Sequence, residues 1–360
     1  MTAKTIGILT SGGDCGGLNA VIRAVVHRAA AYGWRVLGIR DGTMGLLERP
    51  LRYSELSLSS VDITTMRLGG TVLGTTNKGN PFAFPMPNKT VKDRSSEIIA
   101  GVRELGLDAV IGIGGDGSFA ILRKLAQRGK FPLVGIPKTI DNDVGLTETS
   151  VGFDTAVAIA TEALDRLQPT AASHARVMVL EVMGRDAGHI ALHAGISGGA
   201  DVILIPEIPY DLDKVAAKIN ALKEQGRNFA LVVVSEAVRT IEGNTIKVEY
   251  RGGARRFGGI GHYLGAVIAE ATGAETRVTV LGHVQRGAPP SAQDRLLGTA
   301  FGVHAVDLIA EGKFDRMVAW RNRQVIDVPL ADAVAKNQAV DVNSHLVKTA
   351  RALGICLGDE

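Results

Sequence analysis

The sequence is poor in aromatic residues, in cysteine and in long apolar runs. Only 4% of its 360 residues are aromatic, and its two cysteines are Cys15 and Cys356. Two cysteines are too few for a disulfide framework and offer no metal-ligand spacing, which favours a reducing, cytoplasmic location. No apolar run reaches the roughly 18 residues of a membrane span. The short apolar run near the start is followed at once by glycines, so no signal peptide is expected.

The charge balance is also close to neutral. The formal net charge is +3, and the basic residues are scattered along the chain, so neither a nucleic acid nor an anionic membrane is expected as a partner. Hydrophobic residues make up 46% of the chain, enough to bury a substantial core in two α/β domains. The 44 glycines suit many tight turns between strands and helices.

Short β-branched runs alternate with helical segments along most of the chain. TIGILT at 5–10 is predicted to be a strand, followed by a glycine loop at 11–18 and a helix that ends at Gly33. The runs RVMVLEVMG, DVILIPE and NFALVVVSE repeat the pattern further along. This alternation predicts an α/β protein with doubly wound, mostly parallel sheets. A domain boundary is expected near 151–154.

Two polar segments about twenty residues apart carry the strongest chemical signal. GGDGS at 114–118 and PKTIDND at 137–143 each follow a short apolar run, with a helical segment between them. In a βαβ unit these segments emerge side by side at the carboxyl ends of the strands, where open α/β folds bind ligands. Carboxylates, a lysine and bare glycine backbone then share one crevice. That combination suits phosphoryl transfer, which depends on positioning and charge neutralisation.

Residue types within the two segments suggest roles. The stretch GIGGDG at 112–117, which overlaps the first segment, also fits a GxGxxG pattern through Gly112, Gly114 and Gly117. Asp116 would repel a pyrophosphate unless a divalent cation intervened, so we interpret Asp116 as a Mg²⁺ partner. Asp141 can accept a proton from an attacking hydroxyl, Thr139 offers a hydroxyl, and Lys138 offers a positive charge to a phosphate. Asx-rich segments after proline are also common simple turns.

Anion-binding features occur elsewhere in the chain. The glycine loop at 11–18 precedes a helix whose free amides can receive an anion, but it lacks the lysine of a P-loop, and a packing turn is the alternative. Arginine suits phosphate because its guanidinium binds two oxygens at once. Polar segments at the ends of further strand-like runs suggest a phosphorylated sugar as substrate. Their polar residues are Arg176, Arg185, Glu236, Arg277, His283 and Arg286.

These motifs together resemble the 6-phosphofructokinase family. The matching segments, in order, are LTSGGDCGGLNAVIR, GGTVLGTTNKGNPF, IGGDGS, PKTIDND, HARVMVLEVMGR, SEAV, ETRVTVLGHVQRG and QDR. The resemblance covers the chain to about Gly312. It implies two three-layer α/β/α domains, with a donor domain at 1–152 plus about 285–335 and a sugar-phosphate domain at 153–284 plus about 336–360. It also implies glycolytic phosphorylation of fructose 6-phosphate at its 1-hydroxyl, Mg²⁺ as cofactor, and a homotetramer with shared active sites, a dimer being the alternative.

The resemblance also assigns roles to individual residues. Asp141 is implied as the catalytic base, with Lys138, Thr139 and Arg185 beside it, and Asp116 as the Mg²⁺ residue. The implied donor residues are Gly13, Asn77, Lys78, Gly115, Asp116, Gly117 and Ser118. The implied sugar-phosphate residues are Thr139, Ile140, Asp141, Met183, Gly184, Arg185, Glu236, His283, Val284, Gln285 and Arg286, with Arg176 and Arg277 from a neighbouring subunit.

The phosphoryl donor is left open between ATP and pyrophosphate, as in the bacterial-type subgroup that combines this glycine and lysine. Lys138 resembles pyrophosphate-using relatives, in which the ammonium can stabilise the phosphate leaving group. Those relatives often carry aspartate at the position of Gly117, and its carboxylate would repel the α-phosphate of a nucleotide. Gly117 leaves that space open. Asn77 and Lys78 stand where familiar ATP enzymes carry an arginine, so one donor contact is altered. We favour ATP, with reversible pyrophosphate-dependent transfer as the alternative.

Two alternatives come from other classes of protein. A lipid or NAD kinase could use a GGDG loop, but PKTIDND, MGR and GHVQRG together are not expected in one. A nonenzymatic sugar-phosphate sensor would be expected to lack the base at Asp141, which is present.

Overall fold

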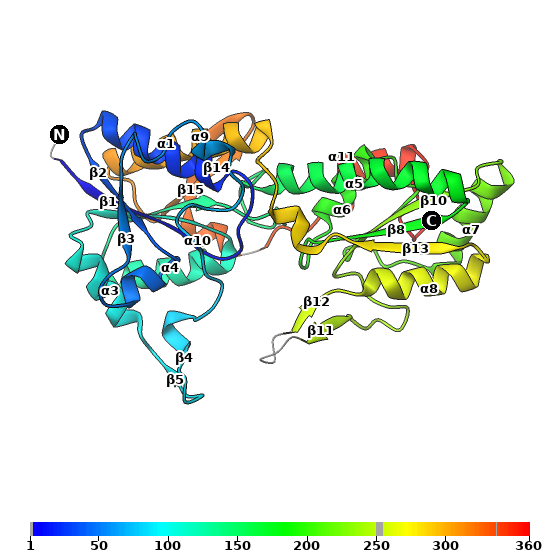
Figure 1. The fold of residues 1–360 in the computed structure, drawn as a ribbon, viewed down its shortest axis with the longest axis horizontal. Helices are drawn as coiled ribbons and strands as arrows, with labels where there is room; N and C mark the ends of the chain where they lie inside the picture. The colour runs from blue at the N-terminus through cyan, green and yellow to red at the C-terminus, as the bar shows by residue number, and fades with distance from the viewer. Residues whose placement is uncertain (1–2, 250–254, 336) are drawn as a thin grey trace. The chain divides into compact units, whose positions relative to one another are not determined.

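Two mainly parallel sheets, each covered by helices, account for the architecture of the chain (Figure 1). The computed structural model describes residues 3–249, 255–335 and 337–360. Contacts divide the chain into unit 1, Met1–Thr155 with Arg286–Asn337, and unit 2, Ala156–Gln285 with Gln338–Glu360. These cuts differ by a few residues from the ranges expected from the sequence. The predicted fold class, α/β with mostly parallel sheets, is confirmed.

The sheet of unit 1 has seven strands in the order β15-β14-β7-β6-β1-β2-β3. The interior pairs from β14 to β2 are parallel, whereas β3 and β15 pair antiparallel at the two edges. The interior strands are buried on both faces, which explains why their sequences are continuous apolar runs. The strands are β1 (Thr5–Thr10), β2 (Arg35–Ile39), β3 (Tyr53–Leu56), β6 (Ala109–Gly114), β7 (Leu133–Pro137), β14 (Arg316–Arg321) and β15 (Gln324–Pro329).

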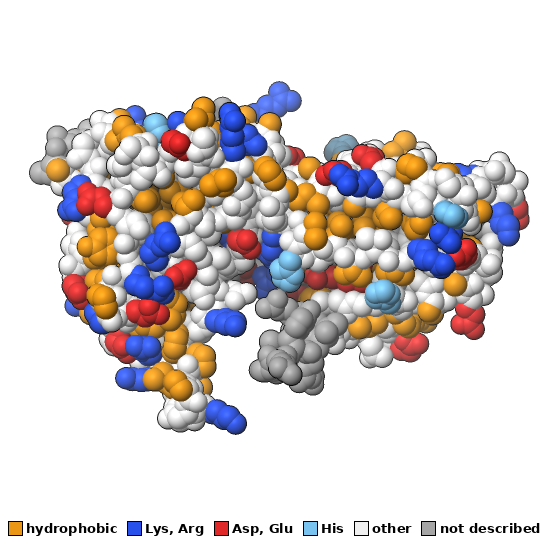
Figure 2. Space-filling model, viewed as in Figure 1, with side chains coloured by type: hydrophobic (Ala, Val, Ile, Leu, Met, Phe, Trp, Pro, Cys, Tyr) orange, Lys and Arg blue, Asp and Glu red, His pale blue; other side chains and the backbone are white. Residues whose placement is uncertain are grey.

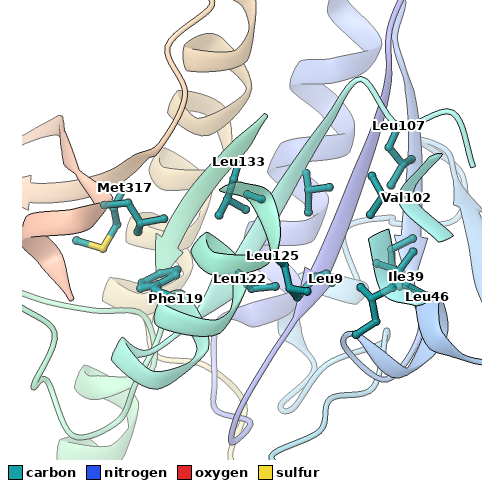
Figure 3. Packing of buried hydrophobic residues seen from close by; sticks show 14 of the residues in the cluster. Leu9, Ile39, Leu46, Val102, Leu107, Phe119, Leu122, Leu125, Leu133 and Met317 are labelled. Atoms are coloured by element: carbon teal, nitrogen blue, oxygen red, sulfur yellow. The ribbon is translucent and has the colours of Figure 1, made fainter. Parts of the chain in front are cut away.

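Helices cover both faces of this sheet, so unit 1 has three layers (Figure 1). On one face lie α1 (Leu18–Ala31) and α9 (Ala292–Ala310), and on the other α2 (Met44–Leu47), α3 (Ser95–Glu104), α4 (Asp116–Gly129) and α10 (Leu330–Ala333). Phe119, Leu122 and Leu125 of α4 pack with Leu9 and Leu133 of the sheet (Figure 3). Each such buried side chain contributes about 1.5–3 kcal/mol. This burial fixes α4, and therefore its amino terminus, against the sheet.

Unit 1 carries one long excursion between β3 and α3. It contains the 3-10 helices η1 (Thr65–Arg67) and η2 (Pro81–Ala83) and a small antiparallel hairpin of β4 (Phe84–Pro85) and β5 (Val91–Lys92). The excursion passes the site described below at Thr75 and Thr76.

The sheet of unit 2 has four parallel strands in the order β13-β8-β10-β9. Val179 and Val232 face the core formed with α7 and α8, while Met178 and Leu231 face α5. The elements of this unit are α5 (Phe153–His174), β8 (Val177–Val182), α6 (His189–Ser197), β9 (Val202–Leu204), α7 (Leu212–Glu224), β10 (Ala230–Ser235), β11 (Lys247–Glu249), β12 (Arg255–Phe257), α8 (Ile260–Thr272), β13 (Thr276–Val280), the 3-10 helix η3 (Gly282–Arg286, whose last residue belongs to unit 1) and α11 (His345–Ala352). The first residues of α5 belong to unit 1.

The segment GGDGS, expected to be a loop, is partly helical. Gly115 is the N-cap of α4, and Asp116, Gly117 and Ser118 form its first turn. An acidic residue in the first turn is favoured by the helix dipole, which offsets the cost of Gly117. The phosphate-binding candidate is therefore a helix amino terminus.

The surface mixes charges of both signs. On the face drawn in Figure 2, basic side chains lie beside acidic ones over much of the surface. Examples are the ion pairs Arg35–Glu55, at 3.0 Å, and Arg128–Asp93, at 2.7 Å. Exposed pairs of this kind contribute at most about 1 kcal/mol each. Within the described part of the chain, no helix has both the length and the apolar character needed to cross a membrane.

Candidate active site

Three polar segments meet at the carboxyl edge of the unit 1 sheet because β1, β6 and β7 are adjacent and parallel. The loop after β1 starts with Ser11, whose N–H donates to Ile113 O at 2.9 Å. The segment after β7 starts with Lys138, whose N–H donates to Gly114 O at 2.9 Å. Backbone hydrogen bonds thus hold the glycine loop, the start of α4 and the PKTIDND segment side by side. This is the edge at which doubly wound sheets bind ligands.

The amino terminus of α4 offers open space at Gly117. Gly117 is exposed, and a Cβ built there would have no atom within 4 Å. The helix leaves its first amides without intrahelical partners, and its dipole favours an anion at this end. Asp116, half-buried in the same turn, adds a carboxylate. Phosphate oxygens suit this terminus, and the Asp116 carboxylate is a group that would hold a divalent cation.

Lys138 is buried beside the glycine loop. Its side chain Nζ donates to the carbonyl oxygen of Gly13, and the residue is only 4% exposed. Burial lowers the pKa of Lys138, and the Arg286 guanidinium lowers it further, against the raising effect of Cys15 and Asp141. The lysine expected to face a phosphate is therefore also a brace that ties the segment after β7 to the loop after β1.

Arg286 holds the same loop from another direction. Its Nη1 donates to Asp14 O at 2.8 Å. A Cβ at Gly13 would overlap this guanidinium, so a larger residue there would displace the Arg286 side chain. Arg286 was expected with the sugar phosphate, and in the structure it lies in unit 1 against the glycine loop.

The PKTIDND segment forms a tight, buried turn around Asp141. The Asp141 N–H donates to Thr139 Oγ1 at 3.0 Å, and Asp141 is 3% exposed. Asn142 has a left-handed φ of 53°, a conformation that asparagine tolerates. Its Oδ1 accepts from Ser150 N at 3.0 Å, and its Nδ2 donates to Glu148 O at 3.1 Å. Asn142 therefore fixes the turn that presents Asp141. Ile140 is buried in the same turn.

The excursion before α3 lies along the glycine loop. Thr75 Oγ1 donates to Gly12 O at 2.7 Å, and Gly12 N donates to Thr76 O at 3.0 Å. Asn77 and Lys78 follow and are exposed. Unit 1 thus gathers all seven expected donor residues, together with Lys138, Thr139, Ile140, Asp141 and Arg286.

Unit 2 gathers a second group of expected residues at the carboxyl edge of its own sheet. Met183, Gly184 and Arg185 follow β8, and Glu236 follows the adjacent β10. Glu236 Oε1 accepts from Gly184 N at 3.3 Å and from Arg185 N at 3.1 Å. The carboxylate thereby shapes the MGR turn, in which Arg185 has a left-handed φ of 49° and an exposed side chain.

The remaining expected residues of unit 2 differ in exposure. His283 and Val284 are exposed in η3, whereas Gln285 is buried. Gln285 Oε1 accepts from Met183 N at 2.8 Å, so its side chain supports the MGR turn from within the unit. The sugar-phosphate contact expected of Gln285 stays a prediction.

Arg176 and Arg277 share one acidic neighbour in unit 2. Both pair with Glu275, Arg176 at 2.9 Å. Their guanidinium groups are therefore gathered at the amino end of β13 and the start of β8. This places two of the arginines expected to bind phosphate together.

The residues that anchor the glycine loop and the PKTIDND segment to the starts of α5 and α9 were not predicted from the sequence. Ser150 and Thr155 act at the start of α5, and Asp294 acts from α9. A signal was available for Asp294, because Ser291 and Asp294 have the spacing of a helix capping box. Ser291 does cap α9, its side chain accepting from Asp294 N at 3.1 Å.

Comparison with known proteins gives consistent matches. The family model described as phosphofructokinase matches residues 5–309. The ATP-dependent 6-phosphofructokinase 1 of Synechocystis sp. is 66% identical over 99% of both chains, and that of Nostoc sp. is 63% identical over 99% of both. Among solved structures, Pichia pastoris phosphofructokinase in the T-state matches with a TM-score of 0.81 and 29% identity over 99% of this chain. This chain spans 37% of that yeast chain.

Proposed function

The chain belongs to the phosphofructokinase family, and from this premise we propose that it transfers a phosphoryl group from ATP to the 1-hydroxyl of fructose 6-phosphate in glycolysis. The observation that carries the proposal is the adjacency of two features in unit 1. The open amino terminus of α4 follows β6, and the turn that contains Asp141 follows the adjacent strand β7. An anion-binding helix end beside a buried carboxylate suits transfer of a phosphoryl group to a hydroxyl.

ATP is supported as the donor by the space at Gly117. Gly117 favours ATP, whereas Lys138 resembles the lysine of pyrophosphate-using relatives. This disagreement is reduced, because the Lys138 ammonium donates to the carbonyl oxygen of Gly13. Its hydrogen bond to the glycine loop gives the lysine a role that does not require pyrophosphate. The two relatives with 66% and 63% identity are both named ATP-dependent.

Each part of unit 1 has a task in the reaction. Asp141 accepts the proton of the attacking sugar hydroxyl, which gives general base catalysis typically worth about 10²–10⁴-fold. The α4 amides and the glycine loop receive the donor phosphates, with Asn77, Lys78 and Ser118 around them. The family resemblance assigns to Arg185 the neutralisation of charge on the transferred group. Positioning and charge neutralisation then supply most of the rate enhancement.

Mg²⁺ suits the residues proposed to bind the phosphoryl donor. Asp116 supplies a half-buried carboxylate in the α4 first turn, where donor phosphates would also supply oxygens. Mg²⁺ prefers oxygen ligands and typically takes one or two carboxylates together with phosphates and water. When bound, the cation would neutralise part of the negative charge of the donor phosphates.

Unit 2 is assigned the sugar phosphate. Glu236 and the MGR turn would bind the sugar, and His283 would bind its phosphate. A homotetramer is the assembly proposed, with Arg176 and Arg277 acting on a neighbouring subunit's substrate. The cytoplasm is the proposed location.

A coupled assay tests this function directly. Enzyme with ATP, Mg²⁺ and fructose 6-phosphate should form fructose 1,6-bisphosphate, detected through aldolase. The matched control replaces fructose 6-phosphate with fructose, which lacks the phosphate that the arginines recognise. Absence of the bisphosphate, or equal rates with the two sugars, would contradict the proposal.

A further inference from the structure

Asp294 is a buried carboxylate that none of the proposed catalytic roles uses. It lies in the first turn of α9 and is only 1% exposed. Its Oδ1 accepts from Gly152 N at 2.8 Å. Its Oδ2 accepts from Thr155 N at 2.8 Å and from Thr155 Oγ1 at 2.5 Å. Three donors from the start of α5 therefore converge on one carboxylate from a helix about 140 residues away in the chain.

The glycine loop packs directly on this cluster. A Cβ at Gly17 would lie 3.3 Å from Asp294 Cβ, and a Cβ at Gly16 would lie 2.9 Å from Thr155 Oγ1. Gly17 is the N-cap of α1 with a left-handed φ of 97°. The starts of α1, α5 and α9 thus meet at Asp294. Its position sets how closely the glycine loop can approach the start of α5.

The start of α5 is in turn bonded to the segment that carries Asp141. Val151 N donates to Pro137 O at 3.1 Å, and Val151 bridges Lys138 as a parallel partner. Ser150 Oγ donates to Thr139 O at 3.0 Å. One residue separates Val151 from Phe153, the first residue of α5. A displacement of this helix start would therefore displace the turn around Asp141.

The chemistry of the cluster requires a carboxylate. All three groups that reach Asp294 from α5 are donors, so both of its oxygens must accept. An asparagine has one accepting oxygen, and its amide would face an N–H group. Burial makes that mismatch costly, because an unsatisfied buried donor has no water to replace its partner. The cluster would have to move apart to relieve it.

We propose that Asp294 is a positioning residue for phosphoryl transfer, which holds the glycine loop and the Asp141 turn in register through Thr155 and the start of α5. This inference rests on the proposed function. It assigns to Asp294 an effect on the rate of the chemical step, in addition to its contribution to stability. A misplacement of about 1 Å at a reacting group can lower a rate about 10²-fold.

The test measures kcat, both KM values and thermal unfolding for four variants and the parent enzyme. Asp294→Asn removes an accepting oxygen from the cluster, and Thr155→Val removes a donating hydroxyl. Thr155→Ser keeps the hydroxyl. Asp307→Asn is the matched control, because Asp307 joins the other end of α9 to α1 through Arg28 at 2.6 Å. It removes a carboxylate of the same helix without touching the start of α5.

We expect Asp294→Asn and Thr155→Val to lower kcat by about tenfold or more at temperatures where both are folded. KM for fructose 6-phosphate should stay within about twofold, since binding of its phosphate is assigned to unit 2. Thr155→Ser should restore kcat, and Asp307→Asn should lower the melting temperature with kcat retained. If Asp294→Asn does not fold, the Thr155→Val and Thr155→Ser pair decides.

Two results would overturn the inference, and they are distinguishable. An active parent whose Thr155→Val and foldable Asp294→Asn variants keep kcat, with only lower melting temperatures, leaves Asp294 a purely structural residue. An inactive parent contradicts the proposed function itself, and the inference with it.

Discussion

Lys138 donates a hydrogen bond from its Nζ to the carbonyl oxygen of Gly13, so the segment after β7 holds the loop after β1. Both segments belong to the proposed phosphate site, which makes this bond part of the site's construction. The buried ammonium has a lowered pKa, chiefly because burial disfavours its charge. The relationship gives a structural reason for a lysine in an enzyme that uses ATP.

Replacing Lys138 should loosen the glycine loop. Lys138→Met leaves the Gly13 carbonyl without this donor, and a hydrogen bond from a charged group contributes about 1.5–3 kcal/mol. We expect KM for ATP to rise and kcat to fall, each by several-fold. Lys313→Met, which removes an exposed lysine paired with Glu311, is the control and should change neither. Unchanged ATP kinetics in Lys138→Met would show that the brace is dispensable.

Asp141 should be essential for turnover but not for sugar binding. Asp141→Ser removes the general base, and we expect kcat to fall by about 10²–10⁴-fold. Calorimetric binding of fructose 6-phosphate should weaken far less, because its phosphate is assigned to unit 2. Asp62→Ser, at an exposed position of unit 1, is the control. Turnover that survives in Asp141→Ser would exclude this residue as the base.

Gly117 should govern access of the nucleotide. A Cβ there would meet no atom within 4 Å, and an acidic residue is favoured near a helix amino terminus. Gly117→Asp should therefore fold, yet raise KM for ATP by about tenfold or more through repulsion of the phosphates. Gly117→Ala should bind ATP much as the parent does. Equal KM values for the two variants would argue that no nucleotide phosphate lies at this turn.

Cys15 should be inert in the folded protein. Burial raises its pKa to about 12, and the thiolate is the reactive form. In a Cys356→Ser variant, the remaining thiol should react with a disulfide reagent at pH 8 only after unfolding. Because the unfolded thiol ionises near 9.0, this group destabilises the fold as the pH rises above that value. Rapid, stoichiometric labelling of the folded variant would contradict the burial of Cys15.

Much of the fold followed from local sequence patterns. The strand at 5–10 has the expected bounds, and the helix after it ends before Gly33, which has a left-handed φ of 71°. The start of α4 was expected to be a loop, whereas Asp116 stands in its first turn, where the helix dipole favours an acidic residue. Local patterns also gave no sign that β3 and β15 close the unit 1 sheet as antiparallel edges.

The candidate site could be predicted only where its residues follow neighbouring strands. Asp116 and Asp141 lie on adjacent β-α connections, so strand order alone brings them together. The contacts of Arg286 with Asp14 and of Asp294 with Gly152 join residues 272 and 142 positions apart. Such contacts depend on how the helices pack, which periodicity does not specify.

The proposal that ATP is the phosphoryl donor is tested most directly by comparing two phosphoryl donors. Initial rates are measured with ATP and with pyrophosphate, at saturating fructose 6-phosphate and Mg²⁺, on the same enzyme preparation. We expect rapid formation of fructose 1,6-bisphosphate with ATP and a rate at least about tenfold lower with pyrophosphate, since Gly117 leaves room for a nucleotide. A pyrophosphate rate equal to or above the ATP rate would contradict it.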